Sequence, residues 1–236
     1  MTDFLVVQLA APLAAFGNAP GNVERKTLDR PTRSALIGLA GAALGVERQD
    51  ADANERLASS FSTASRTLCA GQLLRDFHTY ESIQRSKEVY RTRADALARG
   101  TRNVSITRRD YRSGGWWLGA YAQRHGACVT LEMLAEAFRA PAFTLYLGRK
   151  SCSLSRPLVP KIVAEADIVL AFARYAQFEN LPVKGLIAVD EDLLPAGRSD
   201  FLRRNMVRDD PRSRSTWQFG MRAELLLGAD EEEIPV

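Results

Sequence analysis

The sequence predicts an α+β protein. Its 236 residues are enough for one large or two small domains with a hydrophobic core, and 46% hydrophobic and 25% charged residues are usual for a soluble globular chain. Apolar periodicity in residues 1–148 gives the order strand, helix, strand, long insertion, strand, helix, strand. That order predicts a ferredoxin-like (RRM-like) domain, a split βαβ sheet that often serves as an RNA-binding platform. Residues 149–236 are expected to form a smaller β-rich part.

The individual elements follow from apolar patterns bounded by turn residues. In the first part, strands are predicted over residues 4–9, 61–69, 116–122 and 143–147, and helices over 30–45, 50–60 and 131–138. In the second part, we expect a turn-rich basic loop over 148–157, a helix over 167–176, strands over 186–189, 202–207 and 216–227, a turn over 208–214, and an acidic, frayed tail over 230–233.

The helix over residues 30–45 has clear start and stop signals. Thr32 can cap its first free amides, and Gly45 can end it in a left-handed turn. Gly38 and Gly41 lie inside the helix, where each costs roughly 1 kcal/mol relative to alanine. We therefore expect another backbone to pack closely against this face.

The predicted insertion, residues 72–112, carries the positive character of the chain. From residue 85 to residue 112, nine cationic and three acidic residues give a local excess of +6, against +4 for the whole chain. Tyr80, Tyr90 and Tyr111 are interleaved with these charges. Cations bind phosphates and aromatic rings stack on unpaired bases, so the stretch favours single-stranded nucleic acid. The alternative interpretation is a solvated, partly disordered loop.

Two further basic groups are expected to form an RNA site on the body of the protein. One surrounds the start of the first helix, where free amides and the helix dipole favour a phosphate, and the other lies in loop 148–157. The alternative is that the arginines at this helix are simply solvated. With the insertion and its root, the predicted RNA-binding residues are Arg25, Lys26, Arg30, Arg33, Arg75, His78, Arg108, Arg109, Tyr111, Arg112, Arg149, Lys150 and Arg156.

Catalysis has weak support in the sequence. His78, beside Arg75 and Tyr80 at the root of the insertion, is the one candidate general base, because His125 lies in a polar turn. No carboxylate cluster accompanies a His or Cys, and no nucleotide-binding glycine loop is present, so we expect no metal and no cofactor.

Cysteine usage and hydropathy indicate the compartment. Three scattered cysteines without metal-ligand spacing fit a reducing cytoplasm. The longest apolar run, residues 35–46, is too short to span a bilayer, and no export signal opens the chain. We expect a cytoplasmic protein without a membrane partner.

Several motifs, spread in order over most of the chain, carry a family likeness. They are LVVQLAAPLAAFG from Leu5, RPTRSALIGLAGAALGVERQD from Arg30, LRDFHT from Leu74, TRRDY from Thr107, YLGRKSCSLSRPL from Tyr146 and RDDP from Arg208. On these motifs the chain resembles the CasD subunit family of the type I-E CRISPR surveillance complex, Cascade, within the RAMP superfamily. Residues 80–102 and 159–202 depart from the family pattern.

The resemblance implies a RAMP fold whose ferredoxin-like domain carries the insertion as a thumb. It implies binding of the 5′ handle of the CRISPR RNA, contacts with the Cascade backbone and large subunits, and contact with target DNA only through the complex. In this subtype another subunit cuts the precursor RNA, whereas related proteins of another subtype cut it with a metal-independent Tyr, Lys and His site. The leading hypothesis is therefore a non-catalytic RNA-binding assembly subunit; the alternatives are a metal-independent endoribonuclease using His78 and a general single-strand binding protein.

Overall fold

The computed structural model describes residues 1–17, 23–84, 89–194 and 201–228. Arg85, Lys87 and the acidic tail over 230–233 lie outside these ranges. In the described part, one nine-stranded sheet has the order β10-β11-β9-β5-β7-β1-β8, with β3 and β6 also paired to β7. Its strands are β1 (Thr2–Ala14), β3 (Glu24–Arg25), β5 (Phe61–Cys69), β6 (Gln72–Ile83), β7 (Arg102–Gln123), β8 (Lys161–Glu165), β9 (Ile187–Asp190), β10 (Arg203–Ser213) and β11 (Gln218–Leu227).

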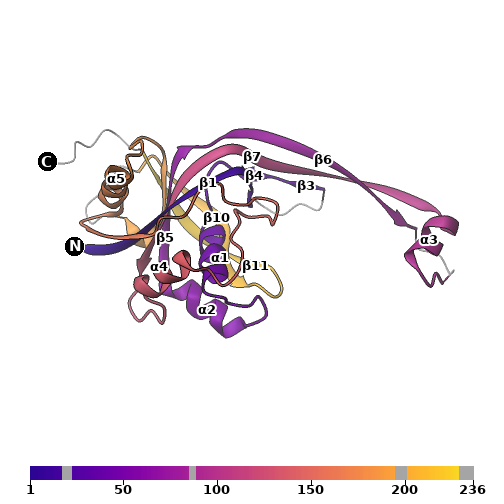
Figure 1. The fold of residues 1–236 in the computed structure, drawn as a ribbon, viewed down its shortest axis with the longest axis horizontal. Coiled ribbons are helices and arrows are strands. Elements are labelled where there is room, and N and C mark those ends of the chain that lie inside the picture. The colour runs from indigo at the N-terminus through magenta and orange to yellow at the C-terminus, as the bar shows by residue number, and fades with distance from the viewer. Residues whose placement is uncertain (18–22, 85–88, 195–200, 229–236) are drawn as a thin grey trace.

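Helices cover both faces of the sheet (Figure 1). The described helices are α1 (Arg33–Ala43), α2 (Ala51–Ser60), α3 (Arg93–Arg99), α4 (Leu131–Arg139), α5 (Ile168–Glu179) and the short 3₁₀ helix η1 (Glu191–Leu193). Along β1, Leu5 and Val7 pack in one core with α1 and α4, while Phe4 and Val6 pack in a second core with α5. Burial on both faces explains why β1 is a continuous apolar run.

The helix signals near residue 30 are confirmed. The Thr32 side chain accepts a hydrogen bond from the Ala35 amide at 3.3 Å, and Gly45 has a φ of 74°. The Val46 amide then donates to the Gly41 carbonyl at 2.8 Å, which closes the helix. The helix itself is shorter than predicted, because residues 30–32 form the approach to it.

The interior glycines of α1 do face close neighbours, but these are side chains. A Cβ built on Gly38 would lie 2.9 Å from Nη1 of Arg214, and one on Gly41 would lie 3.2 Å from Cδ2 of Leu57. The expected backbone contact is therefore wrong. The space at Gly38 accommodates a guanidinium from the C-terminal hairpin, and the space at Gly41 accommodates α2.

Two predictions of secondary structure are wrong. The segment over residues 143–147 forms one bridge, Tyr146 to Ser153, and the strand next to β1 is instead β8, antiparallel to it. The predicted turn over 208–214 belongs mostly to β10. Register shifts between Val207 and Asp210 and around Pro211 let this strand continue through the proline.

The insertion is an ordered hairpin in the described residues. β6 pairs with the outer half of β7 from Gln72 opposite Ser113 to Ile83 opposite Arg102. The ribbon projects far from the body and carries α3 near its tip (Figure 1). The alternative interpretation, a partly disordered loop, is therefore wrong for the described residues.

Strands from both parts of the sequence share the sheet. β8 lies beside β1, while β9 joins β5 to the hairpin of β10 and β11. The division into domains at residues 148 and 149 stays a prediction. Two short strands, β2 (Phe16–Gly17) and β4 (Thr27–Leu28), form a separate pair. No described helix is long and apolar enough to cross a membrane.

Candidate nucleic-acid interface

The base of the projecting hairpin brings together three segments that are distant in sequence. β1 pairs with β7 only as far as Ala14 opposite Arg112, so the same edge of β7 is free further out. In that outer part, β3 pairs with the free edge of β7 in the parallel direction, with Arg25 opposite Arg109. Loop 148–157 reaches the same place, where Gly148 packs directly against the backbone of Ala15. A Cβ atom at position 148 would lie 1.7 Å from the Ala15 carbonyl oxygen, so only glycine permits this approach.

Arg149 links the three segments. Its Nη1 donates to the Asp110 carbonyl at 3.1 Å, its Nη2 donates to the Arg25 carbonyl at 3.2 Å, and its guanidinium lies 4.4 Å from the centre of the Tyr111 ring. Tyr111 is 7% exposed and belongs to the core on the α1 side. Its ring packs inside the protein under Arg149, so it is not presented for base stacking.

A second arginine fixes the buried carboxylate of this group, Asp110. Arg75 donates to both oxygens of Asp110, at 2.8 Å and 3.2 Å. These hydrogen bonds hold the pKa of Asp110 below its ordinary value, and the nearby charges of Lys26 and Arg149 lower it further. The Arg75 side chain is 53% exposed, so its outer edge still faces solvent.

We call the resulting surface the hairpin-base cluster, defined by the exposed or half-exposed cations of the segments that meet at Asp110: Arg25, Lys26, Arg75, Arg108, Arg149 and Lys150. Arg108 pairs with exposed Glu24 at 3.0 Å. Arg112 is half-buried and donates to the Leu28 carbonyl at 3.3 Å, and Nε of Arg109 is buried without an acceptor. Asp110 orients the cluster, and its only signal in the sequence is its place inside the TRRDY motif.

Two of the predicted RNA-binding arginines do not face this surface, which corrects the expectation drawn from their position before α1. Arg33 is 3% exposed. Its side chain donates to Asp190 at 2.7 Å, to Asp210 at 3.0 Å and to the Ala58 and Phe61 carbonyls. Arg30 is also buried and donates to Glu224 at 2.5 Å. Both guanidinium groups are engaged inside the protein and unavailable to a phosphate.

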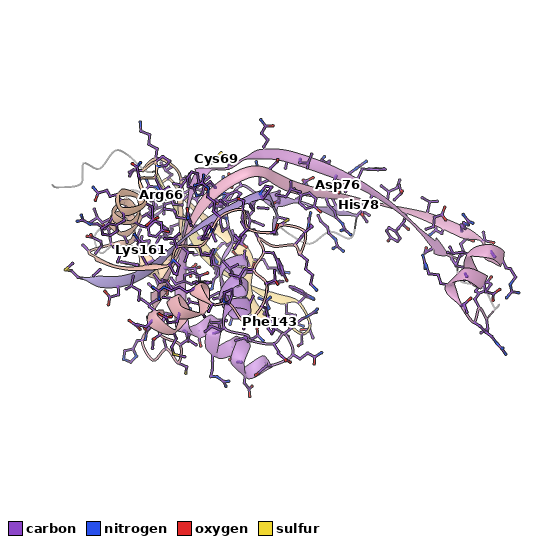
Figure 2. The ribbon with its side chains drawn as sticks, viewed as in Figure 1. Arg66, Cys69, Asp76, His78, Phe143 and Lys161 are labelled. Carbon is purple, nitrogen blue, oxygen red and sulfur yellow. The ribbon has the colours of Figure 1, made fainter. Side chains whose placement is uncertain are left out.

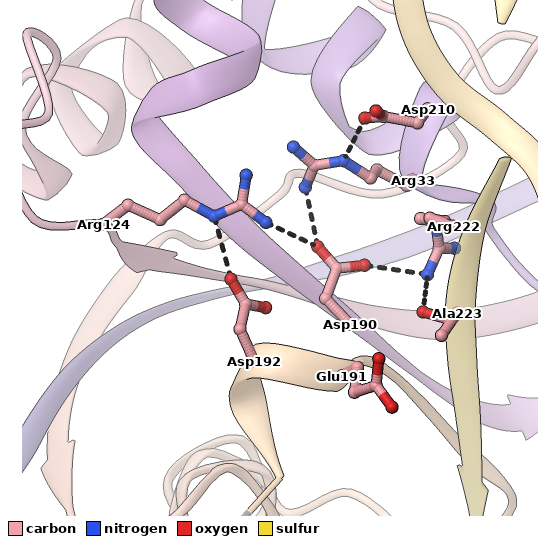
Figure 3. A pocket seen from close by; sticks show the side chains of 8 residues that line it. All are labelled: Arg33, Arg124, Asp190, Glu191, Asp192, Asp210, Arg222 and Ala223. Carbon is pink, nitrogen blue, oxygen red and sulfur yellow. Dashed lines mark hydrogen bonds and ion pairs between the residues drawn. The ribbon is translucent and has the colours of Figure 1, made fainter. Parts of the chain in front are cut away.

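Arg33 belongs to a charged cavity of about 390 Å³ between β9, η1 and the C-terminal hairpin (Figure 3). Asp190 accepts bonds from Arg33 and from Arg222, the latter at 2.9 Å, and Arg124 lies 3.8 Å away. Burial raises the pKa of Asp190, and the arginines oppose that rise. Because the charges lining this cavity are paired with one another, we interpret it as a structural network that ties α1 to the C-terminal strands.

His78 lies on the projecting ribbon, outside the body (Figure 2). Its ring nitrogen Nε2 contacts Asp76, two residues earlier on the same ribbon face, and both side chains are about half exposed. Tyr80, 54% exposed, continues this face. Among the described residues, no group of His, Cys, Asp and Glu could hold a metal ion.

Arg156 lies at the other end of the basic loop and stacks on a different ring. Its guanidinium is 4.5 Å from the centre of the Trp116 ring, and Arg156 is exposed. The loop is held along β1 by hydrogen bonds from the Ser155 amide to the Ala10 carbonyl and from the Gln8 amide to the Leu158 carbonyl. Arg156 is thus fixed on the body beside the hairpin-base cluster but contacts separate residues.

Comparisons with known proteins agree on one family. Residues 4–223 match a family model described as CRISPR-associated protein (Cas_Cas5). The CRISPR system Cascade subunit CasD of Escherichia coli (strain K12) is 30% identical over 203 residues, which cover 82% of this chain and 84% of that protein.

Solved structures share the fold. A chain of a CRISPR RNA-guided surveillance complex matches with a TM-score of 0.64 at 22% identity, covering 96% of this chain and 89% of its own length. A crystal structure of a Cas protein matches with a TM-score of 0.61 at 23% identity, covering 95% of each chain.

Proposed function

Because the chain belongs to the Cas5 family of CRISPR-associated proteins and has a CasD relative, we propose that it is a non-catalytic subunit of a type I-E Cascade surveillance complex that binds the 5′ handle of the CRISPR RNA. In this proposal β5, β7, β1 and β8 form the ferredoxin-like RAMP core, and the hairpin of β6 and β7 is its thumb. The partners are the CRISPR RNA, the backbone subunit and the large subunit, with target DNA reached through the complex in the cytoplasm.

The observation that carries this proposal is the hairpin-base cluster. Its six cations face two carboxylates: Asp110, which already accepts both bonds from Arg75, and exposed Glu24, which pairs with Arg108. The group therefore keeps a net positive charge at the point where the ribbon leaves the body. An RNA strand lying there would contact Arg25, Lys26 and Lys150, which are exposed.

The identity of the bound RNA is the first test. We expect the protein, purified with the products of neighbouring genes, to retain small RNAs that share one repeat-derived 5′ end. RNAs of random sequence would favour the general single-strand binding protein instead.

The position of the site is tested by reversing charge. The triple variant Arg25→Glu, Lys26→Glu, Lys150→Glu should lose RNA affinity by about tenfold or more, since each charged contact contributes about 1.5–3 kcal/mol. The matched control reverses three exposed arginines elsewhere: Arg56, Arg139 and Arg203. Equal losses in the two variants would mean that net charge, not this cluster, determines binding.

One observation favours an endoribonuclease as the second candidate. Asp76 contacts His78 in the way that a carboxylate orients a general base, and Tyr80 continues the same face. Against it, the face is an exposed two-stranded ribbon, which holds a reacting group poorly. Labelled repeat RNA incubated with the isolated protein in chelator should stay intact, and specific cutting that His78→Ala abolishes would favour the nuclease.

A further inference from the structure

An arginine inside the sheet has no acceptor. Arg66, in β5, is 1% exposed, and its Nε and Nη1 atoms are fully covered without a hydrogen bond in the described structure. It lies in the body, away from the projecting ribbon (Figure 2). Burial lowers its pKa to about 10. A buried guanidinium without a partner is strongly unfavourable, so its presence indicates that an acceptor is missing from the isolated chain.

A second buried donor without an acceptor lies next to it. Arg66 is opposite Leu118 in the register of β5 and β7, and Trp116 is two residues further along β7, on the same sheet face. The indole Nε1 of Trp116 is buried without a hydrogen bond. Gln8 of β1 flanks Leu118 from the other side, and Arg156 stacks on the Trp116 ring at 4.5 Å.

The chemistry of these groups selects the ligand. Guanidinium and indole nitrogens only donate hydrogen bonds. A water molecule bound between them would need acceptors for its own two protons, whereas an anionic oxygen accepts every bond that these groups offer. A phosphate group carries several such oxygens and is matched by the fork of an arginine.

We propose that Arg66 and the Trp116 indole, with Arg156 at the rim, form a phosphate-binding site. The phosphate belongs either to the RNA backbone or to free inorganic phosphate; the RNA source rests on the function proposed above. RNA is favoured because loop 148–157, which supplies Arg156, also supplies Arg149 and Lys150 to the hairpin-base cluster.

Access to the site runs past Arg156. This side chain is exposed, and its stacking on Trp116 is its one contact of this kind in the described structure. Lifting it from the ring uncovers the half-buried indole without breaking an ion pair. Binding then replaces that stacking with a charge-assisted contact to the anion.

Thermal unfolding with inorganic phosphate tests the site in the isolated protein. At constant ionic strength set with chloride, the unfolding midpoint should rise by about 2–4 °C when phosphate exceeds its dissociation constant about fivefold. Arg66→Met and Trp116→Phe should lose this rise. Arg139→Met and Trp217→Phe, on exposed side chains elsewhere, are the matched controls and should keep it.

The variants also separate a ligand site from a structural role. Without phosphate, Arg66→Met should unfold at the wild-type midpoint or above it, because it removes an unpaired buried charge. A large fall in that midpoint, or a phosphate response that Arg66→Met retains, would overturn the proposal. Arg66→Lys, which keeps the charge but not the fork, should retain only part of the response.

RNA binding then identifies the source. A tenfold loss of RNA affinity in Arg66→Met, with no phosphate response left in the RNA-bound wild type, assigns the site to an RNA phosphate. Unchanged RNA affinity with the phosphate response intact assigns it to free phosphate. If the triple variant Arg25→Glu, Lys26→Glu, Lys150→Glu keeps its RNA affinity and its phosphate response, the proposed handle site is wrong and the phosphate site stands.

Discussion

At the scale of single residues, the charged cavity adds a side-chain connection between α1 and the C-terminal strands. Arg33 reaches Asp190 and Asp210, and the Arg33 amide also donates to Asp209 at 2.9 Å. Removing one partner from a buried charged network leaves the remaining charges only partly compensated, which costs more than the pair contributes. We therefore regard this network as a structural lock rather than as a ligand site.

Replacing Arg33 with methionine should destabilise the protein by about 3–5 kcal/mol, because Asp190 and Asp210 each lose an arginine partner and the Ala58 and Phe61 carbonyls lose their donor. Urea unfolding followed by circular dichroism measures the change. Arg56→Met, at an exposed position of α2, is the control. If Arg33→Met unfolds like the control, the cavity is more hydrated than its geometry indicates.

Asp110 provides a pH-dependent test of the hairpin base. Its bonds from Arg75 lower its pKa, so the folded state favours the ionised form. The stabilisation is complete above the ordinary pKa of about 3.9 and is lost as pH falls through the lowered value. Because Arg75 is half exposed, we expect an effect below about 1 kcal/mol.

The carboxyl chemical shift of Asp110 measures this directly. It should titrate below the ordinary range in the wild type and move upward in Arg75→Gln. Local hydrogen exchange at the paired residues of β6 and β7 should speed up at the same pH. A titration that Arg75→Gln does not move would contradict the assignment.

Residue-scale roles were the part least accessible from sequence. Arg33 follows Pro31 and Thr32 at a helix start, a local pattern typical of a phosphate site, but its partners lie in β9 and β10. Tyr111 sits among arginines in the sequence, yet strand alternation turns its ring into the core. A local sequence pattern cannot reveal burial against residues that are distant in sequence. For Arg66, the only sign in the sequence is a charged residue inside a strand of otherwise buried residues.

At the scale of elements, helix ends were predicted well because their causes are local. Thr32 and Gly45 act within four residues of the groups that they satisfy. Strand assignments failed where pairing is decided elsewhere. Leu145 and Leu147 are buried and alternate like a strand, but the Leu147 amide donates to the Cys152 carbonyl in a turn. The place beside β1 goes to the short β8, in which only Val163 is buried.

The contact between α1 and α2 can be tested at Gly41. A leucine there would push against Leu57, whose Cδ2 lies 3.2 Å from the Cβ position. We expect Gly41→Leu to lower stability by about 1–3 kcal/mol, despite the better helix propensity of leucine. Thermal unfolding should show this against Glu55→Leu on the exposed side of α2. An unchanged midpoint would mean that α2 moves aside freely.

At the scale of the whole molecule, one sheet joins all parts of the chain. β7 is its longest strand, with 22 residues, and its inner half lies in the core while its outer half forms the ribbon. This continuity anchors the hairpin-base cluster to a rigid body. The sequence located the insertion by its charge, but a ribbon that buries little apolar surface gives no strong strand pattern, so its form could not be predicted.

The salt dependence of RNA affinity measures how many phosphate contacts are made by the hairpin base and how many by the outer ribbon. Each phosphate neutralised on single-stranded RNA contributes about 0.7 to the slope of log affinity against log salt. Replacing Arg25, Lys26 and Lys150 with alanine should therefore flatten the slope by roughly 2. Replacing Arg91, Arg93 and Arg102, in and beside α3 at the outer end of the ribbon, with alanine removes the same charge. If the handle lies at the base, this second variant should change the slope by much less. The opposite ranking would move the RNA to the tip of the ribbon and leave the hairpin-base cluster with a purely structural role.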